Sequence, residues 1–297
     1  QYGASYSIEC GGEDRDVITK QHTGAIICYS CMNKFLTIAK QAIRSAEKIV
    51  VDGYRKHHHL HYKGVQHQGI VTEADTNAEA AMVRIIRHAF PDHAILGEER
   101  GLDTKLSSPY LWIIDPVDGT TNYSHGVPLF NTTIALQHHK QTVLGIVNQP
   151  ITKELFVAIR SRGAWRNNRK LHVSDTTVLT KAYGFMEWSA TDPVFDRVGN
   201  TIFAALRCAH VRVRNIASGA LTAAYVGSGN TDYCVSVDSP LWDGVAGILL
   251  VEEAGGKVTD FSGKDPRRVW AHDPLAHASV VCSNGILHKR LLAFVRD

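Results

Sequence analysis

The feature that most constrains the fold of this chain is the apolar run from Leu111 to Ile114, which stops at Asp115-Pro116-Val117-Asp118-Gly119-Thr120-Thr121. A short apolar run bounded by turn residues favours a buried strand. The end of that strand then places carboxylates and hydroxyls beside the core. Pro116 fixes the turn, and the spacing directs Asp115 and Asp118 toward one point, where a hard cation can bind.

The residues that follow the two aspartates add a second kind of chemistry. Gly119 permits a close approach of the backbone, and Thr120-Thr121 can open a helix whose free amide groups face an anion. Carboxylates for a metal ion and amides for an oxyanion, side by side, indicate phosphate chemistry. A later segment, Trp242-Asp243-Gly244-Val245-Ala246-Gly247, can supply one more carboxylate.

Each of these motifs has a simpler interpretation when it is taken alone. Aspartates at strand ends often only cap turns, and Trp242-Asp243 could begin a helix, with the Trp packing and the Asp capping. Glu98-Glu99-Arg100 could be a solvated charge run. Because the motifs point to one site when taken jointly, the sequence favours a metal centre.

Three motifs of this chain resemble those of a known family. Asp115-Pro116-Val117-Asp118-Gly119-Thr120 together with Trp242-Asp243-x-x-Ala246-Gly247 is similar to the paired motif of the inositol monophosphatase family. Gly97-Glu98-Glu99 matches a third element of that family, in the expected order and at similar spacing. The resemblance runs from about Met32 to the C-terminus. It implies an α/β (α+β layered) fold of alternating helix and sheet layers, as in inositol monophosphatase and fructose-1,6-bisphosphatase-like proteins, with the site between two lobes.

The predicted metal site draws four carboxylates from three distant segments: Glu98, Asp115, Asp118 and Asp243. Mg²⁺ takes oxygen ligands and is usually bound by carboxylates together with substrate phosphate. Four clustered anions would repel one another strongly without a cation between them. The resemblance implies two or three Mg²⁺ ions, with Asp115 bridging two of them and the Val117 backbone carbonyl as a further ligand.

The resemblance also implies the catalytic roles. Thr120, assisted by Asp75, is expected to position the nucleophilic water, Glu98 belongs to the catalytic set, and Glu99 lies near the site. We expect in-line attack by a metal-activated water with no phosphoenzyme. Inhibition by Li⁺ in place of one weakly held Mg²⁺ follows from the same resemblance.

The expected substrate contacts fall into two groups. The phosphate should lie against the amides of Gly119, Thr120 and Thr121. The small residues Ala217-Ser218-Gly219-Ala220 resemble the segment that contacts the rest of the substrate in the family. The full set of expected contacts is Gly119, Thr120, Thr121, Ser218, Gly219, Ser236 and Asp243.

Ser236 departs from the family pattern. Many members carry Glu or Asp seven residues before the late metal-binding Asp, where it contacts sugar or inositol hydroxyls. A neutral Ser loses that charge-assisted hydrogen bond, although Asp232 or Asp238 could compensate. Lys63 lies about one position from a lysine that some members place near the metal entry. Inositol specificity therefore stays open, whereas hydrolysis is expected.

Composition excludes several classes of protein. A chain of 297 residues with 44% hydrophobic residues can bury a large core. The net charge is +3 and no window holds a block of Lys and Arg, so we expect neither a nucleic-acid partner nor a membrane surface. Apolar stretches are far short of a membrane span. Six cysteines are too few for a disulfide scaffold, which favours a soluble, cytoplasmic protein.

Two segments stand apart from this scheme. Residues 1–30 lack sustained periodicity, and we expect a disordered arm or a processed or added segment there. Residues 31–297 are expected to form a single two-lobed phosphatase domain, with lobes at about 31–190 and 191–297. The cluster His57-His58-His59-Leu60-His61 has no partnered Cys or acidic residue, so an exposed loop is favoured over a metal site.

Apolar periodicity predicts the helices and strands. A first amphipathic helix is expected from Lys34 to Tyr54. A second helix is expected from Thr76 to Phe90, capped by Asp75 and ended by Pro91, with Ala80, Val83, Ile86 and Phe90 inward. Predicted strands cover 111–114, 132–137, 143–147, 154–159, 182–186 and, after a hairpin turn at 166–169, residues 170–173. Further on we expect helices at 196–207, 218–227, 242–254 and 285–295 and strands at 210–214, 232–237, 256–260 and 279–283.

The sequence therefore predicts a Mg²⁺-dependent phosphomonoesterase for a small polyol or sugar phosphate, with inositol monophosphate as the first choice. Fructose 1,6-bisphosphate, histidinol phosphate and 3′-phosphoadenosine nucleotides are alternative substrates of the same chemistry. A regulatory partner of RNA or the transcription machinery, without essential catalysis, is an alternative of a different class. An ester or amide hydrolase is disfavoured because no nucleophile elbow or triad is found. By analogy with relatives, a homodimer that binds a small phosphorylated metabolite is expected.

Overall fold

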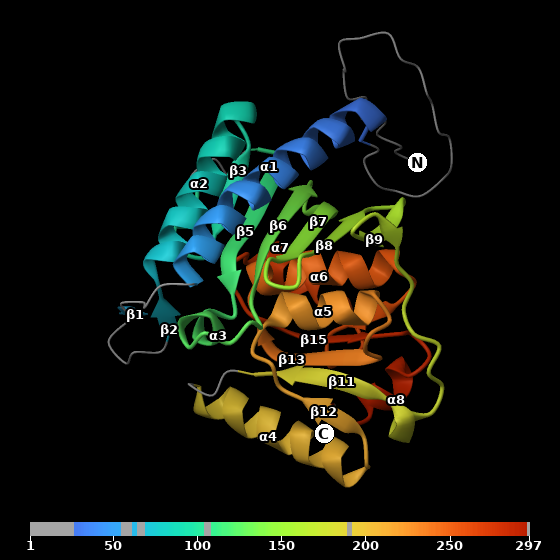
Figure 1. The fold of residues 1–297 in the computed structure, drawn as a ribbon. Helices are drawn as coiled ribbons and strands as arrows, with labels where there is room; N and C mark the ends of the chain where they lie inside the picture. The colour runs from blue at the N-terminus through green and yellow to red at the C-terminus, as the bar shows by residue number, and fades with distance from the viewer. Residues whose placement is uncertain (1–26, 55–60, 64–68, 104–107, 189–191, 296–297) are drawn as a thin grey trace.

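Helices and sheets alternate in five layers (Figure 1). The computed structural model describes residues 27–54, 61–63, 69–103, 108–188 and 192–295. The helices are α1 (Tyr29–Tyr54), α2 (Glu73–Ala89), α3 (Thr120–Ser124), α4 (Pro193–Cys208), α5 (Gly219–Gly227), α6 (Leu241–Glu253), α7 (Arg267–His272) and α8 (His288–Leu292), with a short 3-10 turn at Leu179–Lys181. The layered α/β fold predicted from the sequence is confirmed.

The larger sheet has eight strands, in the order β10-β9-β8-β7-β6-β5-β3-β4. Its strands are β3 (Ala94–Gly97), β4 (Gly101–Leu102), β5 (Tyr110–Asp118), β6 (Asn131–His138), β7 (Gln141–Gln149), β8 (Glu154–Ile159), β9 (Gly163–Arg166) and β10 (Arg169–Lys170). Only β3 and β5 pair in parallel, and the remaining neighbours are antiparallel. Helices α1 and α2 cover one face of this sheet, and α6 lies against the other (Figure 1).

The smaller sheet has five strands, in the order β12-β11-β13-β15-β14. They are β11 (Tyr183–Glu187), β12 (Arg212–Arg214), β13 (Tyr233–Ser239), β14 (Lys257–Thr259) and β15 (Ala278–Ser283). Strand β11 runs parallel to both β12 and β13. A separate hairpin joins β1 (His61–Lys63) to β2 (Gly69–Val71).

Three apolar cores hold the layers together. One core fills the space between α1, α2 and the larger sheet, a second surrounds α5 and α6 between the two sheets, and a third lies between the smaller sheet and α4 and α8. Each sheet is therefore apolar on both faces, which accounts for the near-continuous burial of β6 and β7. No described helix is both long and apolar enough to cross a membrane.

The first two helices illustrate how the predicted elements compare with the structure. The helix expected from Lys34 is confirmed, but α1 begins five residues earlier, at Tyr29. Helix α2 was expected to start after Asp75; it begins at Glu73 with Thr72 as N-cap. Asp75 is the N3 residue, and its Oδ2 accepts a hydrogen bond from the Thr72 backbone N–H at 2.9 Å. This reciprocal cap satisfies a helix-end amide and so moves the start upstream.

The buried face of α2 agrees with the prediction at Ile86 and Phe90 and differs at two other positions. Ala78, Met82 and Ile86 are fully buried, whereas Ala80 and Val83 are half-buried. The alanines and the methionine of α2 are compatible with two overlapping apolar faces at helical spacing. In the structure α2 packs against α1 with the face that also buries Asp75 and Glu79.

Strand β5 was expected to end at Ile114, and it continues to Asp118. Pairing with β6 shifts register between Asp115, opposite Thr133, and Asp118, opposite Asn131. This bulge accommodates Pro116, which cannot donate to a regular ladder. Both aspartates thus lie on a buried strand instead of in a turn.

The remaining differences are at edges and ends. The strand expected at 170–173 is limited to Arg169–Lys170 at the edge of the larger sheet. The last helix spans 288–292 instead of 285–295, and Gly285, with a positive φ of 82°, lies before it. Strand β3 and helix α7 were not predicted, since with four and six residues they are too short to show a periodic pattern. The division into lobes at about residue 190 stays a prediction.

Candidate metal centre

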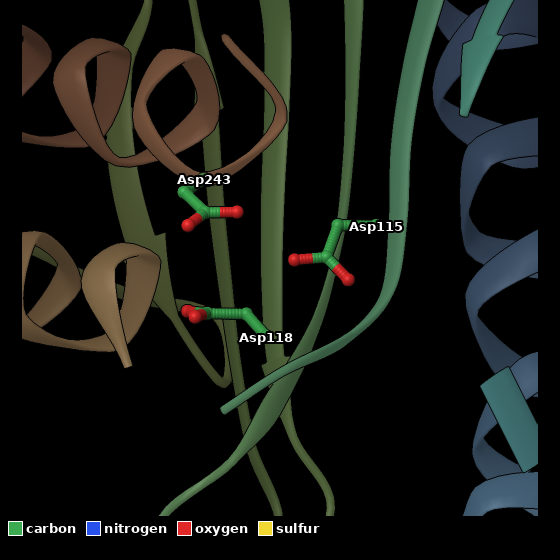
Figure 2. A group of neighbouring side chains, drawn as sticks. All are labelled: Asp115, Asp118 and Asp243. Atoms are coloured by element: carbon green, nitrogen blue, oxygen red, sulfur yellow. The ribbon is translucent and has the colours of Figure 1, made fainter. Parts of the chain in front are cut away.

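Three carboxylates meet where β5, its bulge and the first turn of α6 come together. One oxygen from each of Asp115, Asp118 and Asp243 lies within 4.8 Å of the others. Figure 2 shows the three side chains pointing toward a common space, two from the β5 segment and one from α6. The two motifs lie far apart in sequence, and the packing of α6 on the larger sheet brings them together.

Asp115 is the most deeply buried of the three. It is fully buried, and its Oδ1 accepts a hydrogen bond from the Val117 backbone N–H at 2.9 Å. Its Oδ2 is buried and accepts from no backbone, amide or hydroxyl donor, and the carboxyl of Glu98 is its neighbour at hydrogen-bonding range. Burial raises the pKa of this carboxyl well above its usual range, and the charges of Glu98, Asp243 and Asp118 raise it further. An orphaned carboxylate oxygen among other carboxylates is a site that a cation would satisfy.

Asp118 is held by four donors. Its Oδ2 accepts from Asn131 Nδ2 at 2.6 Å, Ser218 Oγ at 3.1 Å and the Ala220 amide at 2.9 Å, and its Oδ1 accepts from the Gly219 amide at 3.1 Å. Burial raises the pKa of Asp118 to about 6, and these hydrogen bonds lower it. The side chain is thereby fixed in orientation by the start of α5.

Glu98 lies beside the three aspartates, just after the end of β3. Its backbone N–H donates to the Ile114 carbonyl at 3.3 Å, and its side chain is close enough to raise the pKa of Asp115. The turn around it is held by Glu79 of α2, whose carboxylate accepts from the Glu99 amide at 2.9 Å and lies 3.5 Å from Arg100 Nε. Sequence reasoning missed Glu79, although it follows Asp75 by four residues on the same helix face.

The hydroxyl of Thr120 links the predicted catalytic residues. Thr120 Oγ1 lies 2.9 Å from the Val117 carbonyl oxygen and 3.4 Å from Asp75 Oδ1. Burial raises the pKa of Asp75 to about 6, against the lowering effect of its hydrogen bonds to Thr72. The structure thus places the Thr120 hydroxyl next to both Asp75 and the Val117 carbonyl, and the catalytic roles stay a prediction.

The helix expected at Thr120 is present as α3, but it has a single turn of five residues. Gly119 is its N-cap with φ at +92°, and a Cβ there would lie 2.9 Å from the Leu129 carbonyl oxygen and 3.1 Å from that of Ala217. Only glycine fits this conformation and this close approach. A helix this short adds little dipole, so anion binding would rest on its individual free amides, with Thr121 exposed.

The expected substrate contacts have other partners in the described structure. Ser218 and Gly219 both donate to Asp118, and Ser236 is half-buried on β13. Asp232 is bound to Ser174 Oγ at 2.5 Å and to the Tyr183 amide at 2.7 Å, and Asp238 to His277 at 2.7 Å. The list of substrate contacts stays a prediction. His57–His59 and the side chain of Lys63 lie outside what the structure describes.

One buried carboxyl near the site was not predicted. Glu187, the last residue of β11, is paired in register with Ser236 of β13, and its Oε1 accepts from the Ile216 amide at 3.2 Å. Burial raises its pKa to about 8. Nothing in the sequence near Glu187 separates it from a surface glutamate at a strand end.

Comparison with known proteins agrees with this geometry. The sequence model of the inositol monophosphatase family matches residues 32–297. The chain belongs to the inositol monophosphatase family. Within that family, it is 35% identical over 269 residues to the Nus factor SuhB of Pseudomonas aeruginosa, covering 89% of this chain and 97% of that protein.

Two further relatives come from Thermotoga maritima. The protein named fructose-1,6-bisphosphatase/inositol-1-monophosphatase is 36% identical over 228 residues, covering 77% of this chain and 83% of the relative. The solved structure of the IMPase of that organism superposes with a TM-score of 0.78 at 31% identity, over 89% of this chain and 96% of that chain. The layers described above are thus those of the family, and the acidic cluster is consistent with a family metal site.

Proposed function

We propose that this family member is a Mg²⁺-dependent phosphomonoesterase that hydrolyses a small polyol or sugar phosphate, with inositol monophosphate as the leading candidate. The observation that carries the proposal is the orphaned Oδ2 of Asp115 inside a group of three converging carboxylates. Hard oxygen ligands with no thiol or imidazole among them suit Mg²⁺ better than a transition metal.

The residues that would hold two or three Mg²⁺ ions are Asp115, Asp118, Asp243, Glu98 and the carbonyl of Val117. Ions bound there would polarise the phosphoryl oxygens, lower the pKa of the attacking water and neutralise the leaving alkoxide. The protein contributes carboxyl groups shielded from solvent, because Asp115 and Asp118 are both buried.

The other residues of the site bind and orient. Thr120 Oγ1 and Asp75 Oδ1, 3.4 Å apart, would align the water for in-line attack, and Asp75 with a pKa of about 6 can accept a proton near neutral pH. The free amides of Gly119, Thr120 and Thr121 would bind the phosphate oxygens. Asp243, Ser218, Gly219 and Ser236 would contact the polyol.

The deciding experiment is phosphate release from inositol 1-phosphate, fructose 1,6-bisphosphate, histidinol phosphate and 3′-phosphoadenosine 5′-phosphate, each with Mg²⁺ and with EDTA. We expect Mg²⁺-dependent release that Asp115→Asn abolishes. Asp232→Asn is the matched control, because it also neutralises a buried aspartate but one bound to Ser174 and Tyr183. Absence of release from every ester by folded protein in Mg²⁺ would contradict the proposal.

The substrate panel also tests which esters are hydrolysed, a question that the uncharged Ser236 leaves open. Without a charged residue at that position, discrimination between polyols should be weaker, because a Ser hydroxyl makes no charge-assisted hydrogen bond. The relative from Thermotoga maritima is named for both fructose-1,6-bisphosphatase and inositol-1-monophosphatase activity. We therefore expect release from more than one ester, and a single accepted substrate would argue against this part of the proposal.

A second candidate function is a regulatory binding role in transcription, because several relatives are named Nus factor SuhB. The two functions are separable by Asp115→Asn. If the protein acts only as a binding partner, the variant should replace the wild type in cells; if hydrolysis is required, it should not.

We also propose inhibition by Li⁺ and a homodimeric state, both on family resemblance. An unchanged rate of phosphate release in millimolar Li⁺ would contradict the first. A monomer mass by light scattering at micromolar concentration would contradict the second.

A further inference from the structure

The segment 215–218, between β12 and α5, connects several parts of the site. Ser218 and the following two amides donate to Asp118. The carbonyl oxygen of Ile216 accepts from Asn122 Nδ2 of α3 at 2.7 Å. The segment therefore fixes one of the converging carboxylates and also contacts the α3 turn.

This segment has an unfavourable backbone conformation. Ala217 has φ at +52°, in the left-handed region that residues with a Cβ rarely adopt. Asn215 Oδ1 accepts from the Ala217 amide at 2.8 Å, which is a local turn bond. A strained residue persists only where the surroundings impose its conformation.

The side chain of the smaller sheet that contacts this segment is Glu187. It lies at the C-terminal end of β11, only 8% exposed, and its Oε1 accepts from the Ile216 amide at 3.2 Å. The backbone amides of Ala217 and Ser218 also act on this carboxyl group, since they oppose the rise of its pKa. The hydrogen bond from the Ile216 amide ties the segment to a buried carboxyl group that also lies near the next two residues, and we call this contact a clamp.

The protonation state of Glu187 fits a clamp that works by accepting hydrogen bonds. Burial and the nearby charge of Asp118 raise the pKa of Glu187 to about 8, so the group is mostly neutral at pH 7. A neutral carboxyl group still accepts through its carbonyl oxygen, and it adds no charge beside Asp118. A glutamine has the same shape, the same carbonyl acceptor and the same charge.

We propose that Glu187 is a positioning residue, which holds residues 216–218 in the conformation from which Ser218, Gly219 and Ala220 orient Asp118. Its consequence for cation binding rests on the function proposed above. The role is specific to this carboxyl group, because the aspartate at the other end of the neighbouring strand, Asp232, binds Ser174 and Tyr183 instead.

The test compares Glu187→Gln, Glu187→Met and the matched control Asp232→Leu. The Met and Leu variants keep the side-chain volume approximately while removing the acceptor. Two quantities are measured: deuterium uptake by the peptide covering 216–220 in metal-free protein, and the dissociation constant for MgCl₂ by calorimetry. We expect Glu187→Met to speed exchange and weaken Mg²⁺ binding about tenfold each, and Glu187→Gln and Asp232→Leu to stay within about twofold of wild type.

Several outcomes would overturn the proposal. One is wild-type exchange and Mg²⁺ affinity in Glu187→Met. Another is a Glu187→Gln variant as impaired as Glu187→Met, which would make charge the relevant property. A third is an equal loss in Asp232→Leu, which would show a general effect of stability. If wild-type protein binds no Mg²⁺, the proposed function fails, while the exchange measurement still decides the role of Glu187.

A double variant covers the case in which Glu187→Met does not fold. Because glycine adopts positive φ without strain, Ala217→Gly should remove much of the need for the clamp. We expect Glu187→Met with Ala217→Gly to fold and to regain Mg²⁺ affinity to within about threefold of Ala217→Gly alone. A double variant that folds yet keeps the full tenfold loss would contradict positioning through residue 217.

Discussion

At the residue scale, the two oxygens of Asp115 have different environments, and this difference defines the site. Oδ1 is bound to the Val117 amide, whereas Oδ2 faces the other carboxylates with no donor. A buried anion without a donor lowers stability unless a cation or proton compensates it. The residue that is best placed for binding a cation is therefore also a source of instability in the metal-free protein.

The first prediction is that Asp115→Asn stabilises the metal-free protein while abolishing Mg²⁺-dependent phosphate release. At a pH high enough to deprotonate the clustered carboxyls, the neutral amide removes repulsion from Asp118 and Asp243, which should raise the free energy of unfolding by roughly 1–3 kcal/mol. Urea denaturation in EDTA measures this change. Asp232→Asn should lose stability instead, because its carboxylate is already satisfied, and a loss of stability in both variants would contradict the prediction.

The second prediction concerns the hydroxyl of Thr120. Thr120→Val keeps the shape but removes the group that lies 2.9 Å from the Val117 carbonyl and 3.4 Å from Asp75. We expect kcat to fall roughly 100-fold or more, with KM nearly unchanged, because alignment of water acts on the transition state. Thr120→Ser should retain most activity. A change confined to KM would instead assign the hydroxyl to substrate binding.

The sequence predicted part of this site for a clear physical reason. Asp115 and Asp118 share one short segment, so local geometry alone suggests that they converge. Asn131 and Glu187 were missed because their contacts to Asp118 and Ile216 arise from strand pairing and layer packing, which no local pattern encodes. Glu79 was within reach, because it shares a helix face with Asp75.

At the element scale, the approach of α6 to the larger sheet sets the position of Asp243. Gly145 of β7 lies directly beneath Ala246 of α6, and a Cβ on Gly145 would be 3.0 Å from the Ala246 carbonyl oxygen and 3.1 Å from its Cα. The neighbouring atoms are backbone, so they cannot yield without moving the helix. Asp243 is in the first turn of that helix.

The third prediction is that Gly145→Ala displaces α6 and weakens the site at a distance. We expect a loss of roughly 1–3 kcal/mol in the free energy of unfolding, by overpacking, and a weaker affinity for Mg²⁺. Calorimetry with MgCl₂ and urea denaturation measure the two effects. Gly101→Ala is a control with open space around its Cβ, although its positive φ of 72° carries some strain. If Gly145→Ala is destabilised but its Mg²⁺ affinity is unchanged, the position of α6 does not control the affinity of the site, and the prediction is contradicted.

Most helices and strands could be predicted from the sequence, but several of their first and last residues could not. Strand β8 was predicted with its observed bounds, 154–159, because turn residues stand on both sides. The continuation of β5 through Pro116 was not, since a bulge depends on the partner strand and not on the chain that carries it. The starts of α1 and α2 were likewise set by contacts outside the periodic part of each helix.

At the scale of the whole molecule, buried acids make stability depend on pH. Burial raises the pKa of Asp75 to about 6, of Glu79 to about 7 and of Glu187 to about 8. Because the folded state binds protons more tightly than the unfolded state, these groups favour folding most at pH below their ordinary values near 4. That contribution is lost as the pH rises through 6, 7 and 8.

The fourth prediction follows from this loss of stability with rising pH. In EDTA, the Tm should fall between pH 5.5 and pH 8.5, by roughly 2–4 °C for each kcal/mol lost. Added MgCl₂ should raise the Tm more at pH 8.5 than at pH 5.5, since the cation binds deprotonated carboxylates. Differential scanning calorimetry at both values provides the measurement. A metal-free Tm that climbs across this interval would show that these acids are not protonated in the folded state.

The position of α6 between the two sheets has one more consequence, for the order of events during synthesis. Asp115 and Asp118 leave the ribosome long before Asp243, and the helix that carries Asp243 is also a central element of the apolar layer between the sheets. A nascent chain released before this helix would contain the Asp-Pro-Val-Asp motif but would lack the third carboxylate. A cation site that needs all three carboxylates would therefore assemble only after α6 has been made and packed on the larger sheet.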